Sequence, residues 1–112
     1  MKIAISSIDN NIESDVSDIF GRCPYFTVVQ MKDDKIEKTE FIKNENINQN
    51  SGAGVSVAKL MADENVNAVI TGNVGPRALD ILKQFNIEVY SGKGIIKNII
   101  EEFINGKLEK IN

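Results

Sequence analysis

A cation and a thiol are adjacent in one short stretch of the chain, where Gly21, Arg22 and Cys23 are consecutive. Cys23 is the only cysteine, and Pro24 biases its backbone toward an extended conformation and away from helix. We therefore expect the thiol to lie on a loop. A thiolate beside a cation could act as a nucleophile or as a ligand for a soft metal.

The rest of the composition excludes most catalytic uses of that thiol. With no histidine and one cysteine, the chain has no Cys/His or Ser/His/Asp triad, no internal disulfide and no zinc site of the usual kind. A nuclease of this topology would need carboxylates at the ends of the first and fourth strands. These strands end in Ser7 and Thr71, with only Asp9 nearby. We expect a protein that is not an enzyme.

Composition also limits the class of partner. The chain has 112 residues and a net charge of -3, and 42% of its residues are hydrophobic, which predicts one globular domain over residues 1–112. No lysine or arginine cluster forms the basic stripe of a nucleic-acid binder, and no apolar run approaches the length of a membrane span. We expect a cytoplasmic protein that binds neither nucleic acid nor membrane.

Hydrophobic periodicity predicts an α/β fold. Alternating or continuous apolar runs indicate strands, and apolar residues spaced three and four apart indicate helices. The strands are expected at residues 2–7, 25–31, 36–43, 67–71 and 87–90, and the helices at about 51–64, 76–85 and 96–105. The asparagine-rich segment between residues 44 and 50 is expected to be a solvated loop. The order predicts a single mixed five-stranded sheet, 3-2-1-4-5 with strand 2 antiparallel, as in a ribonuclease-H-like motif.

This topology brings three loops to one edge of the sheet. They are residues 8–24, residues 44–52 and residues 71–76, and two helices begin there with free N–H groups. Arg22 adds charge, and Arg77 is a second cation that could do so. We therefore predict an anion pocket beside a thiol of lowered pKa, formed by Arg22, Cys23, Gly52, Ala53, Gly54, Gly72, Asn73, Val74 and Gly75. The alternatives are that the glycines serve turns and close packing alone, and that Cys23 is a buried small apolar residue.

Three motifs also resemble a known family. The segments Phe20–Phe26, Gly52–Gly54 and Thr71–Ala78, with Gly106–Leu108 near the end, look like the dinitrogenase iron–molybdenum cofactor biosynthesis family. The resemblance covers nearly the whole chain and implies a ribonuclease-H-like sheet. It also implies a carrier of an iron–sulfur or iron–molybdenum-type cluster, with Cys23 as the metal ligand and cofactor-assembly proteins as partners. Unlike cofactor-carrying members, this chain has no histidine.

One thiolate per chain limits how a cluster could be held. A cluster assembled on a protein usually needs four thiolates, so Cys23 could hold only a preassembled cluster or one shared between subunits. The chain would then be a monomer or a weak homodimer. The alternative function is a regulatory or scaffold domain that binds a small anionic metabolite or a partner protein, without any cluster.

Overall fold

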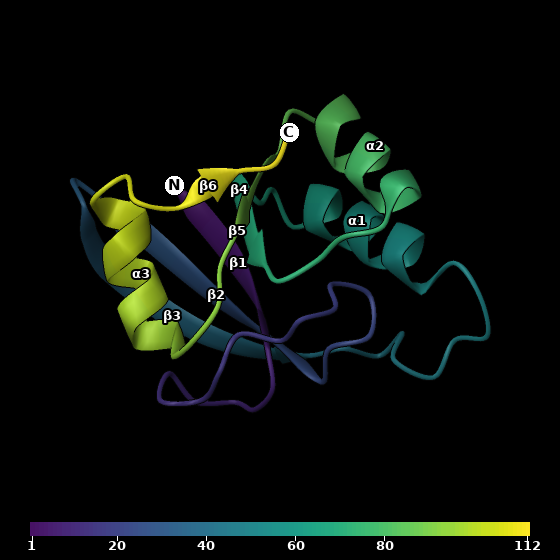
Figure 1. The fold of residues 1–112 in the computed structure, drawn as a ribbon, viewed down its shortest axis with the longest axis horizontal. Coiled ribbons are helices and arrows are strands. Elements are labelled where there is room, and N and C mark those ends of the chain that lie inside the picture. The colour runs from purple at the N-terminus through teal and green to yellow at the C-terminus, as the bar shows by residue number, and fades with distance from the viewer.

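A computed structural model describes all residues 1–112 as one mixed sheet flanked by helices (Figure 1). The sheet has six strands in the order β3-β2-β1-β4-β5-β6. The strands are β1 (Lys2–Ser7), β2 (Tyr25–Lys32), β3 (Lys35–Lys43), β4 (Ala68–Thr71), β5 (Glu88–Ser91) and β6 (Glu109–Lys110). The helices are α1 (Ala53–Asp63), α2 (Pro76–Gln84) and α3 (Ile96–Ile104).

Strand β1 lies in the interior of the sheet and fixes the topology. It pairs antiparallel with β2 and parallel with β4, and β4 pairs parallel with β5. The predicted order of five strands is confirmed, but their number is wrong. The sixth strand, β6, pairs antiparallel with β5 and has two residues, too few to show an alternating pattern. The ribonuclease-H-like designation stays a prediction.

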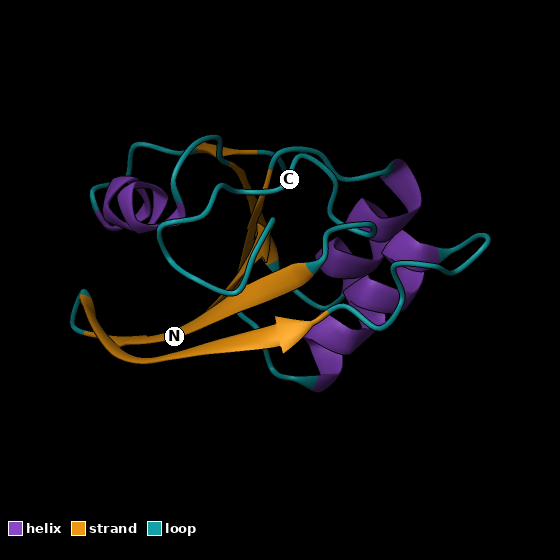
Figure 2. Cartoon of the chain, turned by 90° about the horizontal axis from the view of Figure 1, so that it is seen from below, coloured by secondary structure: helices purple, strands orange, loops and turns teal.

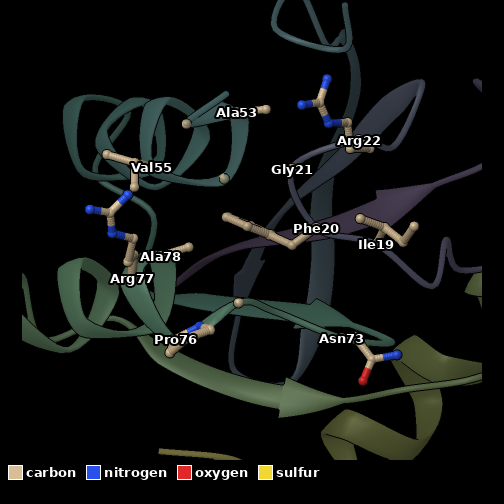
Figure 3. Close-up of a pocket in the computed structure, with 13 residues that line it drawn as sticks. Ile19, Phe20, Gly21, Arg22, Ala53, Val55, Asn73, Pro76, Arg77 and Ala78 are labelled. Carbon is tan, nitrogen blue, oxygen red and sulfur yellow. The ribbon is translucent and has the colours of Figure 1, made fainter. Parts of the chain in front are cut away.

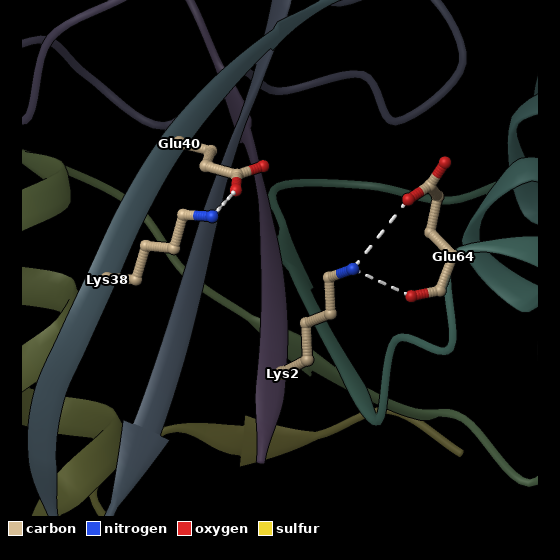
Figure 4. Close-up of polar contacts among 4 residues, drawn as sticks. All are labelled: Lys2, Lys38, Glu40 and Glu64. Carbon is tan, nitrogen blue, oxygen red and sulfur yellow. Dashed lines mark hydrogen bonds and ion pairs between the residues drawn. The ribbon is translucent and has the colours of Figure 1, made fainter.

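The β2–β3 hairpin ends in a tight turn at the polar positions that the sequence indicates. Asp33 and Asp34 have φ values of 53° and 63°, as the favoured two-residue hairpin turn requires. Strand β3 is the expected edge strand and pairs with β2 alone. Its exposed Lys38 forms an ion pair with the half-buried Glu40 at 2.6 Å (Figure 4).

Helices cover both faces of the sheet and produce two apolar cores. In Figure 2, α3 lies on one side of the sheet, and the other two helices lie together on the opposite side. The core under α1 and α2 includes Phe26, Val57 and Leu82, and the core under α3 includes Ile5 and Ile99. No helix is long and apolar enough to cross a membrane.

Lys2 and Glu64 also link β1 to α1, at the sheet edge opposite the one where the three loops are predicted to meet. The Lys2 ammonium donates to the Glu64 carbonyl at 2.8 Å and lies 3.7 Å from the carboxylate of the same residue (Figure 4). Glu64 follows Asp63 as the C-terminal cap of α1, so the cation also lies at the negative end of the helix dipole. The link holds α1 against the sheet.

Candidate functional site

The convergence of three loops at one edge of the sheet is confirmed. Strands β1 and β4 are parallel neighbours, so the loops that follow them leave the sheet side by side. The backbone N–H of Phe20 donates to the Asn73 carbonyl at 3.0 Å, and the N–H of Gly72 donates to the Ser17 carbonyl at 3.2 Å. These bonds hold the first loop against the loop that precedes α2.

Two glycines permit the close approach of these segments. A Cβ atom on Gly21 would lie 2.6 Å from the Gly54 nitrogen, at the start of α1. A Cβ atom on Gly72 would lie 2.6 Å from the Asp18 Cα atom. Both distances are too short for any side chain, so these positions need glycine for backbone packing.

A pocket of about 380 Å³ lies where the loops meet the first turns of α1 and α2 (Figure 3). This volume is in the range of small-molecule sites. In the view of Figure 3, Arg22 and Arg77 lie on opposite sides of Phe20, and the Arg22 guanidinium points away from that ring. The lining residues are Ile19, Phe20, Gly21, Arg22, Gly52, Ala53, Gly54, Val55, Asn73, Gly75, Pro76, Arg77 and Ala78.

Backbone N–H groups without partners face this region from α1. The first backbone bond of the helix runs from the Ser56 N–H to the Gly52 carbonyl, at 2.9 Å. The N–H groups of Ala53, Gly54 and Val55 precede it and donate to no atom of the protein. The N-terminal residue Gly52 has no side chain to cap them. This helix end can therefore donate to an anion.

Helix α2 presents a second such end. Pro76 occupies its first turn and has no N–H group, and the bond from the Leu79 N–H to the Gly75 carbonyl, at 3.0 Å, is the first of the helix. The N–H groups of Arg77 and Ala78 have no acceptor in the protein. Two positive helix ends thus meet at one pocket.

Formal charge adds to the helix ends. The chain has two arginines, Arg22 and Arg77, and both line the pocket. No carboxylate and no lysine lines it. Arg77 is exposed and forms no ion pair. The pocket is therefore positive although the whole chain carries a net charge of -3.

The thiol of Cys23 does not take part in this site. Its side chain is fully buried in the core under α1 and α2, and its Sγ donates to the Phe20 carbonyl at 3.3 Å. Burial raises the pKa of Cys23 from 9.0 to about 12. The expectation of a lowered pKa is wrong, because desolvation of the thiolate outweighs the nearby donors. The alternative of a buried small apolar residue describes Cys23 correctly.

The asparagine-rich loop also differs from its prediction at one residue. Asn44 is 1% exposed, and its side-chain amide donates to the carbonyls of Gly21 at 3.1 Å and Cys23 at 2.8 Å. Its side-chain oxygen accepts from the Asn46 N–H at 3.0 Å. Asn44 thus holds the pocket wall in place, and the expectation of a solvated loop is wrong at this residue.

The pocket contains six of the nine predicted site residues: Arg22, Gly52, Ala53, Gly54, Asn73 and Gly75. Cys23, Gly72 and Val74 are not among the lining residues. The sequence reasoning missed Ile19, Phe20, Gly21, Val55, Pro76 and Ala78, whereas Arg77 was foreseen as a second cation. Counting onward from each predicted helix start would have found Val55 and Ala78.

The donor groups fit an anion better than a bare metal ion. No group of three or more cysteine, histidine, aspartate or glutamate side chains is placed to hold a metal. Backbone N–H groups and guanidinium groups instead bind the outer, electron-rich atoms of an anion. The pocket can accept a charged molecule as a whole without forming a bond to metal.

Known proteins resemble this chain in both sequence and fold. A profile described as "Dinitrogenase iron-molybdenum cofactor" matches residues 1–106. An uncharacterized protein of Methanocaldococcus jannaschii is 41% identical over 111 residues, which span 98% of this chain and 91% of that protein.

Solved structures agree. The apo form of the orange protein from Desulfovibrio gigas has a TM-score of 0.90 and 25% identity, covering 98% of this chain and 92% of that one. The NMR structure of a Thermotoga protein, described as a candidate NifB protein, has a TM-score of 0.82 and 30% identity, covering 97% and 91% of the two chains.

Proposed function

Because the chain belongs to the dinitrogenase iron–molybdenum cofactor family, we propose that its pocket binds an anionic metal–sulfur cluster as cargo. The cluster would be of the iron–sulfur or iron–molybdenum type, and the protein would carry it during cofactor biosynthesis or delivery. The observation that carries the proposal is the gathering of both arginines and two uncapped helix ends in one pocket without a carboxylate.

The geometry supports binding through the outer atoms of the cargo. Cys23 is fully buried with a pKa of about 12, so its thiol is protonated at neutral pH and has no access to the pocket. A preassembled cluster brings its own sulfides, which can accept hydrogen bonds from Arg22, Arg77 and the free N–H groups of α1. Cargo held without a protein–metal bond can be released intact, as a carrier requires.

The apolar part of the pocket favours a sulfide-rich anion over a small metabolite. Ile19, Phe20 and Val55 line the pocket next to the arginines. Sulfide is larger and less strongly hydrated than a phosphate or carboxylate oxygen, so placing it against apolar side chains costs less desolvation. A regulatory domain that binds an anionic metabolite is the alternative, and it predicts preference for phosphate or carboxylate.

We further propose that the protein binds its cargo without transforming it. The lining residues include no histidine, carboxylate or thiol that could serve as a general base or nucleophile. Proteins of cofactor assembly would supply and receive the cargo.

The proposal is tested by anaerobic binding of tetrathiomolybdate, a coloured sulfide-rich anion, followed by its absorbance after gel filtration. Wild-type protein and Cys23→Ala should retain the anion equally. Arg77→Gln should weaken binding by at least about tenfold, which corresponds to about 1.4 kcal/mol, close to the lower end of the range of about 1.5–3 kcal/mol for a hydrogen bond to a charged group.

Lys107→Gln, which removes the same charge outside the pocket, is the matched control and should bind as the wild type does. Loss of binding in Cys23→Ala alone would contradict the proposal. Tighter binding of inorganic phosphate than of tetrathiomolybdate would favour the metabolite alternative.

A further inference from the structure

Arg22 connects the pocket to a second part of the molecule, the asparagine loop, which we define as Asn44–Asn50. Its guanidinium donates from Nη1 to the Ile47 carbonyl at 2.9 Å and from Nη2 to the Asn50 carbonyl at 3.4 Å. In Figure 3 the Arg22 guanidinium is directed away from Phe20, which lines the pocket. One of the two pocket cations is thus engaged by uncharged backbone oxygens of this loop.

An anion in the pocket would compete for this guanidinium. The guanidinium is ionised in both cases, but the two carbonyl oxygens of the loop carry no formal charge, so only a bond to an anion adds the attraction between opposite charges. The bond to Asn50 is also long at 3.4 Å, beyond the usual range for N–H···O bonds. Arg22 is exposed, so its side chain is free to change rotamer. We expect it to leave the loop when an anion arrives.

The two ends of the asparagine loop are attached independently of Arg22. At the first end, the Asn44 N–H donates to the Pro24 carbonyl at 2.9 Å, and its side chain binds the Gly21 and Cys23 carbonyls. Beyond the other end, the Gly52 carbonyl accepts from the Ser56 N–H at the start of α1. The Asn46 N–H also donates to the Asn44 side-chain oxygen at 3.0 Å, and the Gln49 N–H closes a local turn on the Asn46 carbonyl at 3.0 Å. Release of Arg22 would therefore loosen residues 47–50 without detaching the pocket wall.

We propose that the asparagine loop reports the occupancy of the pocket: it is held by Arg22 when the pocket is empty and released when an anion takes that guanidinium. This inference rests on the proposed function, because it needs an anion in the pocket. It assigns the loop a regulatory role, since a partner protein that contacts residues 47–50 would meet different loop dynamics in the empty and the loaded protein.

The test is ¹⁵N relaxation NMR on the whole protein with and without saturating tetrathiomolybdate. In the wild type, the order parameters of residues 47–50 should fall by at least about 0.2 when the anion binds, while those of Asn44 and Asn46 stay in the rigid range near 0.85. In Arg22→Ala, the same residues should be mobile without the anion and should not change when it is added.

Arg77→Ala is the matched control, because it removes the other pocket arginine and breaks no bond to the loop. Its loop should be ordered without the anion and become mobile at an anion concentration that saturates this weaker variant. Bound anion, seen by absorbance, with an unchanged or more rigid loop would overturn this inference and leave the proposed function intact. Failure of the wild type to bind any anion would overturn both.

Discussion

The hydrogen bonds by which Asn44 holds the pocket wall lead to a prediction about stability. Asn44→Ala removes three hydrogen bonds: two to the carbonyls of Gly21 and Cys23, and one from the Asn46 N–H. Each contributes about 1 kcal/mol net, and the two carbonyls belong to buried residues that water cannot easily reach. The free energy of unfolding should fall by about 3 kcal/mol, which lowers the melting temperature by roughly 12 °C in a domain of this size.

Urea unfolding followed by circular dichroism measures this change. The midpoint should fall while the m value stays constant, since the substitution alters stability and not the surface exposed on unfolding. Asn48→Ala is the matched control, because Asn48 is exposed in the same loop and its side chain forms no hydrogen bond. It should change stability by no more than about 0.5 kcal/mol. A decrease in the free energy of unfolding for Asn44→Ala as small as that for Asn48→Ala would show that the hydrogen bonds of Asn44 do not hold the pocket wall.

Further predictions concern the glycines and the thiol. Gly21→Ala should destabilise the protein by about 1–3 kcal/mol in urea unfolding, because its Cβ would lie 2.6 Å from the Gly54 nitrogen. Gly75→Ala has no atom within 4 Å of the added carbon and an ordinary φ of -68°, so it should stay within about 0.5 kcal/mol of the wild type; equal losses in the two variants would contradict the packing argument. The raised pKa of Cys23 means that the folded protein keeps a proton that the unfolded chain loses above pH 9, so this contribution to stability is complete below pH 9 and is lost between pH 9 and about 12. Between pH 9.0 and 10.5 the stability of the wild type relative to Cys23→Ala should therefore fall by about 1.6 kcal/mol, whereas a constant difference would show that the thiol is not desolvated.

Local patterns predicted the elements well because burial imposes a period on the sequence. Ile96, Ile99 and Ile100 share a helix face and all three are buried, and the continuous apolar run of β4 is buried throughout. The predicted strand directions were then sufficient to place the loops of the pocket at one edge of the sheet, because this inference does not depend on the positions of side chains. Strand β6 was missed because its two residues carry no pattern and owe their place to Asn112, whose side chain bonds to the backbone of Val89 and Ile87.

The errors at the site have a common cause, since burial of a loop residue depends on segments distant in sequence. Cys23 has the neighbours of a reactive thiol, yet Val57 of α1 and Leu82 of α2 belong to the same core and the residue is fully covered. Asn44 lies in a segment with the composition of a solvated loop. Its side-chain amide nevertheless donates to two buried carbonyls 21 and 23 residues earlier in the chain. Neither contact has a local sequence signal.

The central claim is that the pocket, and not Cys23, holds the cargo. Locating the bound cargo in a crystal tests this claim most directly. Crystals grown with tetrathiomolybdate and measured at the molybdenum absorption edge would locate the metal by anomalous scattering. We predict a peak inside the pocket, within reach of the Arg77 guanidinium and the Gly54 N–H, with no bond from the metal to Cys23. An anomalous peak bonded to the Cys23 sulfur, or peaks only outside this pocket, would contradict the account.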